Sequence, residues 1–599
     1  MKNIYYLLIV LMTGFCSCVD MDLEPKDELS ESALYKDAPL LEAFLNNQYY
    51  YAGHGFSARE LLLAGLCDEA RFTHAWSQPV YTLNGTVTPA QLGGIVRFRQ
   101  FNWGDVYKGI RECNMILENT EEGVTTITDK DFIKKIRGQA IFLRAYHYHN
   151  LIRIYGGVPI VENTFKLNDD FFVPRNTLAE CIKFVADECD RAAELLPDKW
   201  TDSNIGRASK GAALTLKSRM LLYAASDLFN SPDAWTTGYK NPELIAYTDN
   251  NRQARWQAAK DAAKAVIDLN VYKLYKEDPA AGDSIARNYH EIFITKKHEE
   301  IIWQKFYLAK DVDNTRFARW YGPNGYGGWG SDGPTQQLVD YFLMKDGSKF
   351  DWTNPAHAAN PYKDRDPRLR GSILYDGTKF QTRIPATIGW DPEGIIETAV
   401  SIEYINDKGE KVTRPGLDTR KGPYEDWNGS YTNYYINKFI NNDFTVNSDQ
   451  QEIPWIYMRY AEVLLNYAEA CIGAGDEGEA ISTLNKLRKR AGMPDIPATT
   501  TGAALLDLCR NERIVELAFE EHRYFDARRW LTAQKDFSRK ASGIDITAKL
   551  NADNKTYTKT YTVPSAETQD RKFSIQNYLS PIPEEEMNAN SLFIQNPGY

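Results

Sequence analysis

Residues 461–494, AEVLLNYAEACIGAGDEGEAISTLNKLRKRAGMP, carry the pattern that decides the fold. Apolar residues recur at helical spacing on both sides of a glycine-rich stretch, which predicts two helices joined by a turn at 473–477. Ala468 stands where the first helix would meet its partner closely, and Ala480 follows the turn glycine Gly475 by five residues. This is the tetratricopeptide register, in which helix pairs stack to bury faces that one pair cannot bury alone.

Helical periodicity extends over two blocks of the chain, at about 38–269 and 456–530. Within the first block, Trp256, Ala259 and Val266 recur on one face of a predicted helix. Residues 210–229 are apolar nearly all round, which predicts a helix buried between other helices. A helical scaffold follows.

Two further helix pairs of the same kind are predicted in the first block. We expect 101–119 to pair with 131–155, and 178–196 to pair with 209–229.

Between the blocks, residues 306–454 are rich in Gly, Pro, Asn, Asp and aromatics, with one clear helix near 335–344. A stretch this long without regular structure in a compact protein is usually functional. We therefore place the binding surface there. The predicted fold class is mainly α: a tetratricopeptide-like helix-pair scaffold supporting a loop-rich, variable ligand-binding half.

Composition narrows the class of ligand. The 599 residues are 43% hydrophobic and carry a net charge of −11 with no long Lys/Arg run, which indicates a globular protein and disfavours nucleic acid as a partner. The eight cysteines form no CxxC motif and no spaced Cys/His set for zinc, so we expect buried free thiols. With 36 Tyr and 13 Trp, some aromatic rings are expected to work at the surface.

The N-terminus, with FCSCVDMDLEP at 15–25, has the features of an export signal. The apolar run at 4–15 is far shorter than the ~20 residues that cross a bilayer, and it is typical of a signal core. Ser17 is a small residue before Cys18, so we predict a signal peptide at 1–17, cleavage before Cys18 and lipidation of its thiol. The alternative is an ordinary signal peptide with incidental cysteines. An acidic tether at 18–36 should hold the folded part off the membrane.

One aromatic loop, ARWYGPNGYGGWG at 318–330, is the first candidate binding site. It matches G-x-G-x-x-G at 325–330, but no buried parallel strand precedes it, so dinucleotide binding is disfavoured. Its glycine-rich backbone suits an exposed platform on which sugar rings stack. The platform rings would be Trp320, Tyr321, Tyr326 and Trp329. The alternative is that these rings anchor the loop onto the scaffold.

A second candidate loop is CDEARFTHAWSQPVYTLNG at 67–85. Trp76 supplies a further ring, and polar groups beside it suit hydrogen bonds to sugar hydroxyls. Those groups are Asp68, Arg71, His74 and Tyr81. Ordinary loop anchoring is again the alternative.

No catalytic, cofactor or metal site emerges from the motifs. In RNERIVELAFEEHRYFDARRW at 510–530 most acids have an Arg within three or four helical positions, which predicts a structural ion-pair network. His147 and His149 lie on different helix faces, and DVDNT at 311–315 lacks the glycine and glutamate of a calcium loop. HExxH, nucleophile-elbow and Walker A motifs are absent.

The chain resembles the SusD/RagB family of outer-membrane nutrient-binding lipoproteins of Bacteroidetes. The matching pieces keep one order along nearly the whole sequence: CVDMDLEP at 18–25, RGQAIFLRAYHYHNLIRIYGGVP at 137–159, GRASKGAALTLKSRMLLYAAS at 206–226, PTQQLVDYF at 334–342, DPRL at 366–369, RYAEVLLNYAEA at 459–470, LNKLRKRAGMP at 484–494, NERIVELAFEEHRYFDARRW at 511–530 and LSPIPEEEMNANSLFIQNPGY at 579–599.

The resemblance implies one SusD-like domain at 37–599. Its helical scaffold would span about 37–305 and 455–535, its binding region about 306–454, and its C-terminal closing segment 536–599. It also implies a surface-exposed lipoprotein of the outer membrane, without enzyme activity or cofactor. Such a protein captures an oligosaccharide or polysaccharide and delivers it to a SusC-like TonB-dependent transporter.

Family binding sites are shallow arcs of aromatic rings made by loops, which points to Trp320, Tyr326, Trp329 and the Trp76 loop. We expect that replacing Trp320 and Trp329 together by Ala abolishes polysaccharide binding with little loss of thermal stability. Two rivals stay open: a RagB-like lid that captures peptides, and an all-helical carbohydrate-active hydrolase with two carboxylates facing one cleft.

Overall fold

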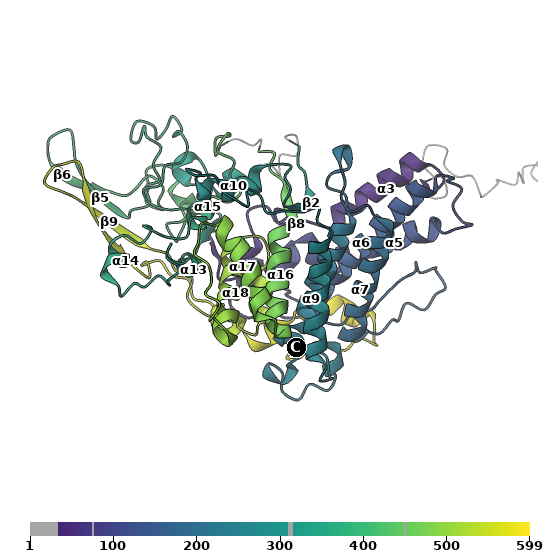
Figure 1. Cartoon of the computed structure of the whole chain (residues 1–599). Coiled ribbons are helices and arrows are strands. Elements are labelled where there is room, and N and C mark those ends of the chain that lie inside the picture. The colour runs from purple at the N-terminus through teal and green to yellow at the C-terminus, as the bar shows by residue number, and fades with distance from the viewer. Residues whose placement is uncertain (1–33, 75–76, 309–315, 448–450) are drawn as a thin grey trace, which may run out of the picture.

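The computed structural model describes residues 34–74, 77–308, 316–447 and 451–599. The predicted signal peptide, Cys18, nearly all of the acidic tether, Trp76 and the segment 311–315 lie outside the described residues. No helix in the described part of the chain is long and apolar enough to cross a membrane. The molecule is elongated, with helices along most of its length and a small sheet at one end (Figure 1).

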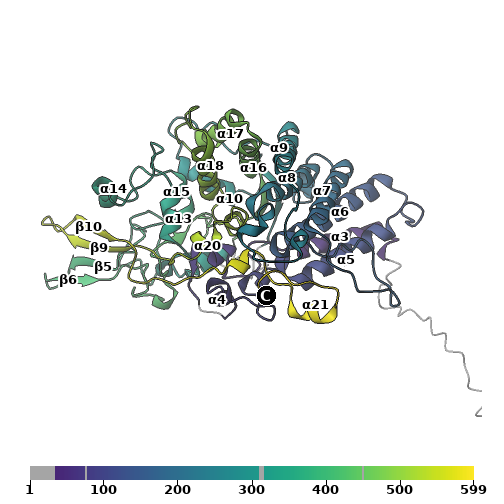
Figure 2. The same ribbon diagram turned by 90° about the horizontal axis from the view of Figure 1, so that it is seen from below.

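The scaffold is a row of antiparallel helices that pack on one another in succession, starting from α3 (Ala38–Tyr51). The other members are α5 (Trp103–Asn119), α6 (Lys130–Tyr155), α7 (Leu178–Leu195), α8 (Lys210–Ala225), α9 (Arg252–Asp268), α16 (Tyr460–Ala474), α17 (Glu477–Arg490) and α18 (Gly502–Glu516). Seen from below, the row curves around one side of the molecule (Figure 2). The predicted pairs α5 with α6, α7 with α8, and α16 with α17 are confirmed.

The two helical blocks of the sequence form one scaffold because α9 packs directly against α16. A Cβ on Gly473 would collide with the indole of Trp256, so the close approach of the two helices requires glycine there. Gly475 then ends α16 in the left-handed conformation, with φ +94°. Ala468 and Ala480 are buried in the same contact region, as the tetratricopeptide register predicts.

Buried ion pairs hold the scaffold together. Glu516 bonds Arg368 at 2.9 Å and Arg459 at 2.7 Å, and it also bonds Arg490. Further along the chain, Arg529 bonds both Glu469 and Asp526. The predicted structural network at 510–530 is confirmed. Its carboxylates are paired with arginine at Glu512, Glu516, Glu520 and Asp526, whereas Glu521 accepts from Gln100.

The segment 306–454 consists of loops, short strands and short helices. The expected helix near 335–344 is α13 (Gln336–Tyr341), but the expectation of a single clear helix is wrong. The structure adds three helices of five residues each, too short for periodicity to signal from sequence. They are α12 (Phe317–Tyr321), α14 (Pro355–Ala359) and α15 (Arg368–Ser372).

Strands join segments that are far apart in sequence. Three two-stranded pairs form: β1 (Ala70–Phe72) with β3 (Asp332–Pro334), β2 (Ile301–Lys305) with β8 (Trp455–Arg459), and β4 (Ile373–Leu374) with β7 (Tyr435–Ile436). A four-stranded sheet lies at the far end of the molecule (Figure 1), in the order β10 (Tyr557–Thr562), β9 (Asp545–Leu550), β5 (Ser401–Ile405) and β6 (Lys411–Arg414). The C-terminal segment thus contributes two strands to the loop-rich half and ends near α21 (Glu584–Ala589; Figure 2).

Candidate functional site

The two loops singled out in the sequence lie side by side, because β1 pairs with β3. Arg71 stands opposite Gly333 in this antiparallel pair. Beyond the strands, the Thr73 amide donates to the Ser331 carbonyl at 2.7 Å, and its hydroxyl donates to the Gly330 carbonyl at 2.6 Å. The segments 67–74 and 329–334 therefore lie side by side and form one edge of the site.

A third loop, residues 417–431, completes the site. A Cβ on Gly330 would lie 2.5 Å from the Asn428 carbonyl oxygen, so this loop approaches the edge too closely for any other residue. The Asn324 side-chain amide donates to the carbonyls of Thr419 and Tyr424, both at 3.0 Å. These bonds fix the third loop against the first two.

Three of the four expected platform rings are not at the surface. Trp320 is only 2% exposed, and Tyr321 and Tyr326 are also buried. Phe317, Trp320 and Tyr321 stand at i, i+3 and i+4 of α12, so they share the helix face that packs into the core. The expectation of an exposed platform is therefore wrong for these rings, and they anchor the loop.

Tyr326 is held between the loops by a buried arginine. The Arg383 guanidinium lies 4.0 Å from the Tyr326 ring centroid and is ion-paired with Asp418 at 2.7 Å and Asp391 at 2.8 Å. A ligand cannot reach this ring without breaking those pairs. Because Trp320 is buried, replacing Trp320 and Trp329 together would remove core packing as well as a half-buried ring.

The remaining expected residues divide between the interior and the surface. Asp68 is buried and bonded to Arg523 at 2.7 and 2.8 Å, so its expected role as a ligand contact is wrong: its carboxylate serves the scaffold. Tyr81 is half-buried on α4 (Ser77–Leu83). Trp329 and His74 are also half-buried, and they lie together because the His74 ring is hydrogen-bonded to the Trp329 backbone.

The most exposed tryptophan of the described residues is Trp427, in the third loop. Its side chain is 61% exposed. It is the middle residue of a short 3-10 turn, Asp426–Asn428. Glu425, just before the turn, is in the left-handed conformation at φ +45°, and Asn428, the last residue of the turn, is buried. This turn faces the indole outward while its neighbours tie the backbone down.

Around Trp427 lie five other side chains that we call the Trp427 cluster: His74, Trp329, Tyr431, Arg71 and Arg420. The His74 and Trp427 ring centroids are 5.9 Å apart. Arg420 braces the turn by donating to the carbonyls of Trp427 at 2.8 Å and Gly429 at 3.0 Å. The guanidinium carbons of Arg71 and Arg420 each lie 3.9 Å from the Tyr431 ring centroid. All three loops thus contribute to one aromatic and cationic surface.

Sequence reasoning missed Trp427, Tyr431 and Arg420. The two rings lie in EDWNGSYTNYY at 425–435, with Arg420 just before it, inside the predicted binding region; this segment is as rich in aromatics as 318–330. A lone tryptophan between two acids and an Asn-Gly pair has no apolar partner at helical or strand spacing. That isolation is the signal that could have identified an exposed ring.

The charges of the cluster affect its protonation. Burial lowers the pKa of His74, the nearby charge of Arg420 lowers it further, and the hydrogen bond to the Trp329 backbone opposes both. His74 is therefore neutral at pH 7, and its Nε2 has no hydrogen-bond partner. Burial likewise lowers the pKa of Arg71, with Tyr431 and Glu567 opposing, but a guanidinium stays protonated at physiological pH.

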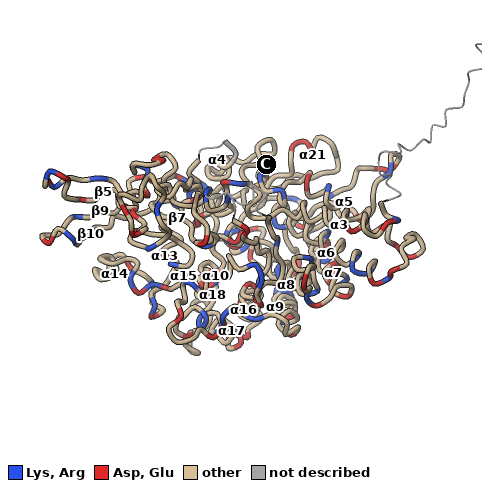
Figure 3. The backbone as a smooth tube through the Cα atoms, turned by 90° about the horizontal axis from the view of Figure 1, so that it is seen from above, with Lys and Arg blue, Asp and Glu red and all other residues tan. Residues whose placement is uncertain are grey.

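The surface charge elsewhere is mixed. Figure 3 shows basic and acidic residues interspersed along the length of the chain. Among the described residues, no group of three or more His, Cys, Asp or Glu side chains is placed to hold a metal ion. The six cysteines of the described part, Cys67 to Cys509, are buried free thiols, as expected.

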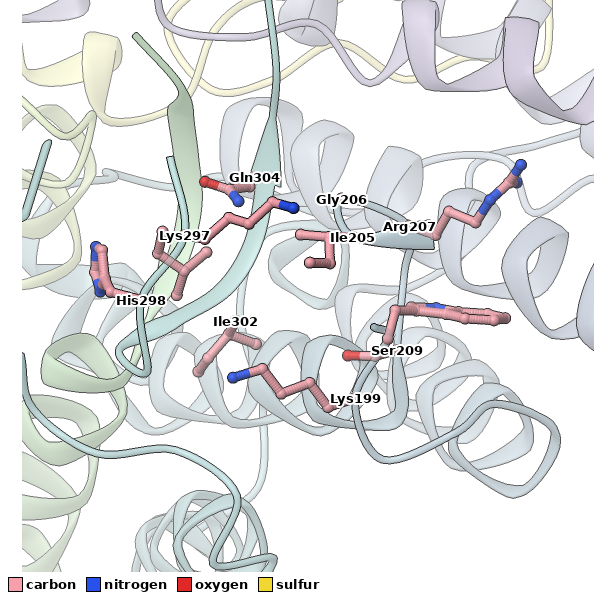
Figure 4. A pocket seen from close by; sticks show the side chains of 11 residues that line it. Lys199, Ile205, Gly206, Arg207, Ser209, Lys297, His298, Ile302 and Gln304 are labelled. Atoms are coloured by element: carbon pink, nitrogen blue, oxygen red, sulfur yellow. The ribbon is translucent and has the colours of Figure 1, made fainter. Parts of the chain in front are cut away.

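A small cavity on the scaffold side is a less suitable glycan site. It has a volume of about 280 Å³ and lies between the connection before α8 and strand β2 (Figure 4). Its one aromatic, Trp200, donates its indole N–H to the Ala208 carbonyl at 2.6 Å. Pockets for drug-sized ligands run from about 300 to 1,000 Å³, so this cavity does not accommodate a long oligosaccharide.

Comparisons with known proteins cover the whole length of the chain. The family model described as SusD family matches residues 299–599, and the one described as starch-binding associating with outer membrane matches residues 27–222. SusD-like protein P2 of Formosa agariphila is 24% identical, with 100% of both chains aligned. A SusD-like protein of Bacteroides ovatus is 21% identical, with 88% of this chain and 82% of that protein aligned.

Solved structures share the same architecture. A SusD-like protein of Bacteroides fragilis is 26% identical and superposes with a TM-score of 0.70, covering 96% of this chain and 100% of that one. A structure described as a laminarin-binding SusD-like protein is 19% identical, with a TM-score of 0.59 over 94% of this chain and 99% of that one. The predicted fold of helix pairs supporting a loop-rich half is thereby confirmed.

Proposed function

The chain belongs to the SusD family, and on that premise we propose that it captures a glycan at the Trp427 cluster. The observation that carries the proposal is the exposure of the Trp427 indole where three loops meet. The apolar face of a sugar ring stacks on such a ring, and aromatic contacts add about 0.5–1.5 kcal/mol to the burial of surface. The surrounding loops are tied by hydrogen bonds, so little conformational entropy is lost when a ligand binds.

The polar groups of the cluster suit sugar hydroxyls. One ring nitrogen of neutral His74 has no hydrogen-bond partner, and Arg420 donates from a fixed position beside the indole. A stacking ring with a few convergent polar groups is the usual composition of a ligand site. The scaffold presents this surface, and the ligand's identity depends on the loops.

The proposal includes the cellular setting. We place the protein at the outer membrane, exposed at the cell surface and anchored through Cys18, where it delivers its glycan to a SusC-like TonB-dependent transporter. Support comes from the family described as associating with outer membrane, whose match includes residues 27–222, and from the signal pattern at 1–17. Detergent extraction of the native membrane, followed by purification of this protein, should recover a barrel transporter with it.

Binding without hydrolysis is the activity we propose. A glycosidase needs two carboxyl groups about 5–9.5 Å apart across an open cleft, one of them with a raised pKa. Beside the strand pair of the site, burial raises the pKa of Glu69 and of Asp332, but each is at most 2% exposed and accepts a backbone N–H. Incubation with each retained glycan should release no reducing sugar.

Affinity gel electrophoresis against a panel of polysaccharides tests the proposal. We expect retention by at least one glycan, and Trp427→Ala should weaken that retention by about tenfold, the equivalent of 1.4 kcal/mol. Tyr557→Ala is the matched control, because Tyr557 is an exposed ring on β10 at the end of the sheet. Equal retention of Trp427→Ala and the wild type would reject the site.

The peptide-capturing alternative has its own outcome. Titration calorimetry with mixed oligopeptides and with oligosaccharides distinguishes the two ligand classes. Heat from peptides alone would replace the glycan proposal with the RagB-like one.

A further inference from the structure

The two arginines of the Trp427 cluster differ from those of the scaffold. Among the described residues, neither Arg71 nor Arg420 lies within ion-pair distance of a carboxylate. By contrast, Arg523, at the start of α19 (Arg523–Arg529), is paired with Asp68 at 2.7 Å and Asp536 at 2.8 Å. The cluster therefore concentrates positive charge on a chain whose net charge is −11.

Arg71 is buried at 8% exposure yet only partly satisfied. Its Nη1 donates to the Glu567 carbonyl at 2.8 Å, and its Nε has no hydrogen-bond partner. A buried donor without an acceptor costs about 1–3 kcal/mol. The charge of Glu567 acts on Arg71, but Glu567 is exposed and bonds Arg71 through its backbone carbonyl oxygen.

Arg420 adds a second charge to the same ring. The Arg420 Nη1 donates to the carbonyls of Trp427 and Gly429. The guanidinium carbon of Arg420 lies 3.9 Å from the Tyr431 ring centroid, the same distance as that of Arg71. The positive charge of Arg420 acts on Arg71 and lowers the pKa of Arg71, and an anion placed between these charges and the solvent relieves the repulsion. Glu425 and Asp426 are the acids of the turn, but Glu425 bonds Asn428 and Asp426 bonds the Trp427 amide.

We propose that the Trp427 cluster selects an anionic glycan, with the indole stacking on a sugar ring and Arg71 and Arg420 receiving an acid group on that sugar or its neighbour. The inference rests on the proposed glycan capture and names its substrate class. The acid group has a delocalised negative charge on oxygen, as in a uronate carboxylate or a sulfate ester, which guanidinium groups bind through paired N–H donors.

Matched polymers test the charge requirement. Polygalacturonate is compared with its methyl ester, and dextran sulfate with dextran, by affinity gel electrophoresis of the full mature chain. We expect at least one acidic polymer to retain the protein about tenfold more strongly than its uncharged partner, because hydrogen bonds to charged groups are worth more than neutral ones. Added NaCl should reduce this difference. Retention by polygalacturonate alone indicates a carboxylate, and retention by dextran sulfate alone indicates a sulfate.

Variants then assign the charge to the cluster. Arg420→Gln should abolish the preference for the acidic polymer, while Arg420→Lys, which keeps the charge, should retain most of it. Arg71→Gln should act like Arg420→Gln. Lys555→Gln removes one exposed charge in the turn between β9 and β10 and should leave the preference unchanged.

Two negative outcomes are distinguishable. Equal retention of charged and uncharged partners, an unaltered preference in Arg420→Gln, or retention only by neutral glycans of the wider panel would overturn the anionic class and leave glycan capture standing. Retention by no glycan of any kind would overturn the proposed function itself.

Discussion

The scaffold and the Trp427 cluster treat arginine in opposite ways. Arg459 of the scaffold is 1% exposed, and it donates to Glu300 and Glu516 at 2.7 Å and to Glu520 at 2.6 Å. Arg71 of the cluster is also buried, but it meets an aromatic ring and one backbone oxygen. The scaffold thus neutralises its buried arginines with carboxylates, whereas Arg71 of the proposed binding surface has no carboxylate partner among the described residues.

Aromatic rings show the same contrast. Phe317, Trp320 and Tyr321 pack inward on α12, whereas Trp427 faces out from a turn that cannot bury it. Both segments are aromatic, glycine-flanked parts of one loop region. What differs is the packing partner: one set has a helical face to share, and the other ring stands alone.

Removing a central carboxylate of the scaffold should have the largest effect. Glu516 is fully buried; burial alone would raise its pKa, but Arg490, Arg459 and Arg368 together hold that pKa well below the ordinary value. Glu516→Ala leaves these three guanidinium groups short of negative charge. We expect a loss of about 3–5 kcal/mol in the free energy of unfolding, measured by urea unfolding with tryptophan fluorescence.

An exposed pair provides the matched control for that change. Lys489 and Asp278 are bonded at 2.5 Å, with about two thirds or more of each side chain exposed. Asp278→Ala should leave the free energy of unfolding nearly unchanged, because an exposed ion pair is screened by solvent. If both variants unfold at the same urea concentration, the contrast between a buried network and a solvated surface does not hold.

Trp320→Ala and Trp427→Ala should separate stability from binding. Removing the buried indole of Trp320 should cost about 3–5 kcal/mol of stability through lost burial and a cavity. Removing the exposed indole of Trp427 should change stability by within about 0.5 kcal/mol. Thermal unfolding and glycan retention, measured on both variants, give the comparison. A Trp427→Ala variant as unstable as Trp320→Ala would show that the exposed ring is structural.

The sequence predicts the scaffold well because its signals are local. The face made by Ala259, Ala263 and Val266 on α9 and the turn at Gly475 follow from 3.6-residue periodicity and from glycine's conformational range. Pairing of α5 with α6 follows from adjacency in the chain. These features need no knowledge of the rest of the fold.

The site is not local, and that is why only part of it is predictable. His74 and Trp329 were selected in separate loops, and β1 brings them together with β3 across about 260 residues, a pairing that periodicity cannot register. Which ring faces solvent depends on what covers it: α12 buries Trp320, and the Asp426–Asn428 turn exposes Trp427. Residue type alone predicts a binding region, and packing decides which of its rings face solvent.

A titratable group at the junction of the two regions gives an effect that depends on pH. Glu69 is buried next to β1; its backbone carbonyl accepts from the Thr335 amide at 2.9 Å, and its carboxyl accepts from the Phe519 amide at 3.0 Å. It therefore links the strand pair of the site to the scaffold. Burial raises the pKa of Glu69 to about 8, with the charge of Asp68 adding to the rise and the Phe519 bond opposing it.

The sign of the pH effect follows from that raised pKa. Between about pH 4.5 and 8 the folded protein keeps the proton on Glu69 that the unfolded chain releases, so this group's contribution to stability falls as pH rises through that window. Glu69→Gln is neutral at every pH and keeps an oxygen to accept from Phe519. Its stability relative to the wild type should grow by about 1 kcal/mol per pH unit from pH 5 to 8 and then level off, as measured by urea unfolding at each pH. Glu122→Gln, at an exposed position, should show no such trend. A constant difference between Glu69→Gln and the wild type would mean that the carboxylate is already charged at pH 5, and that the junction, like the cluster, holds a charge without neutralising it.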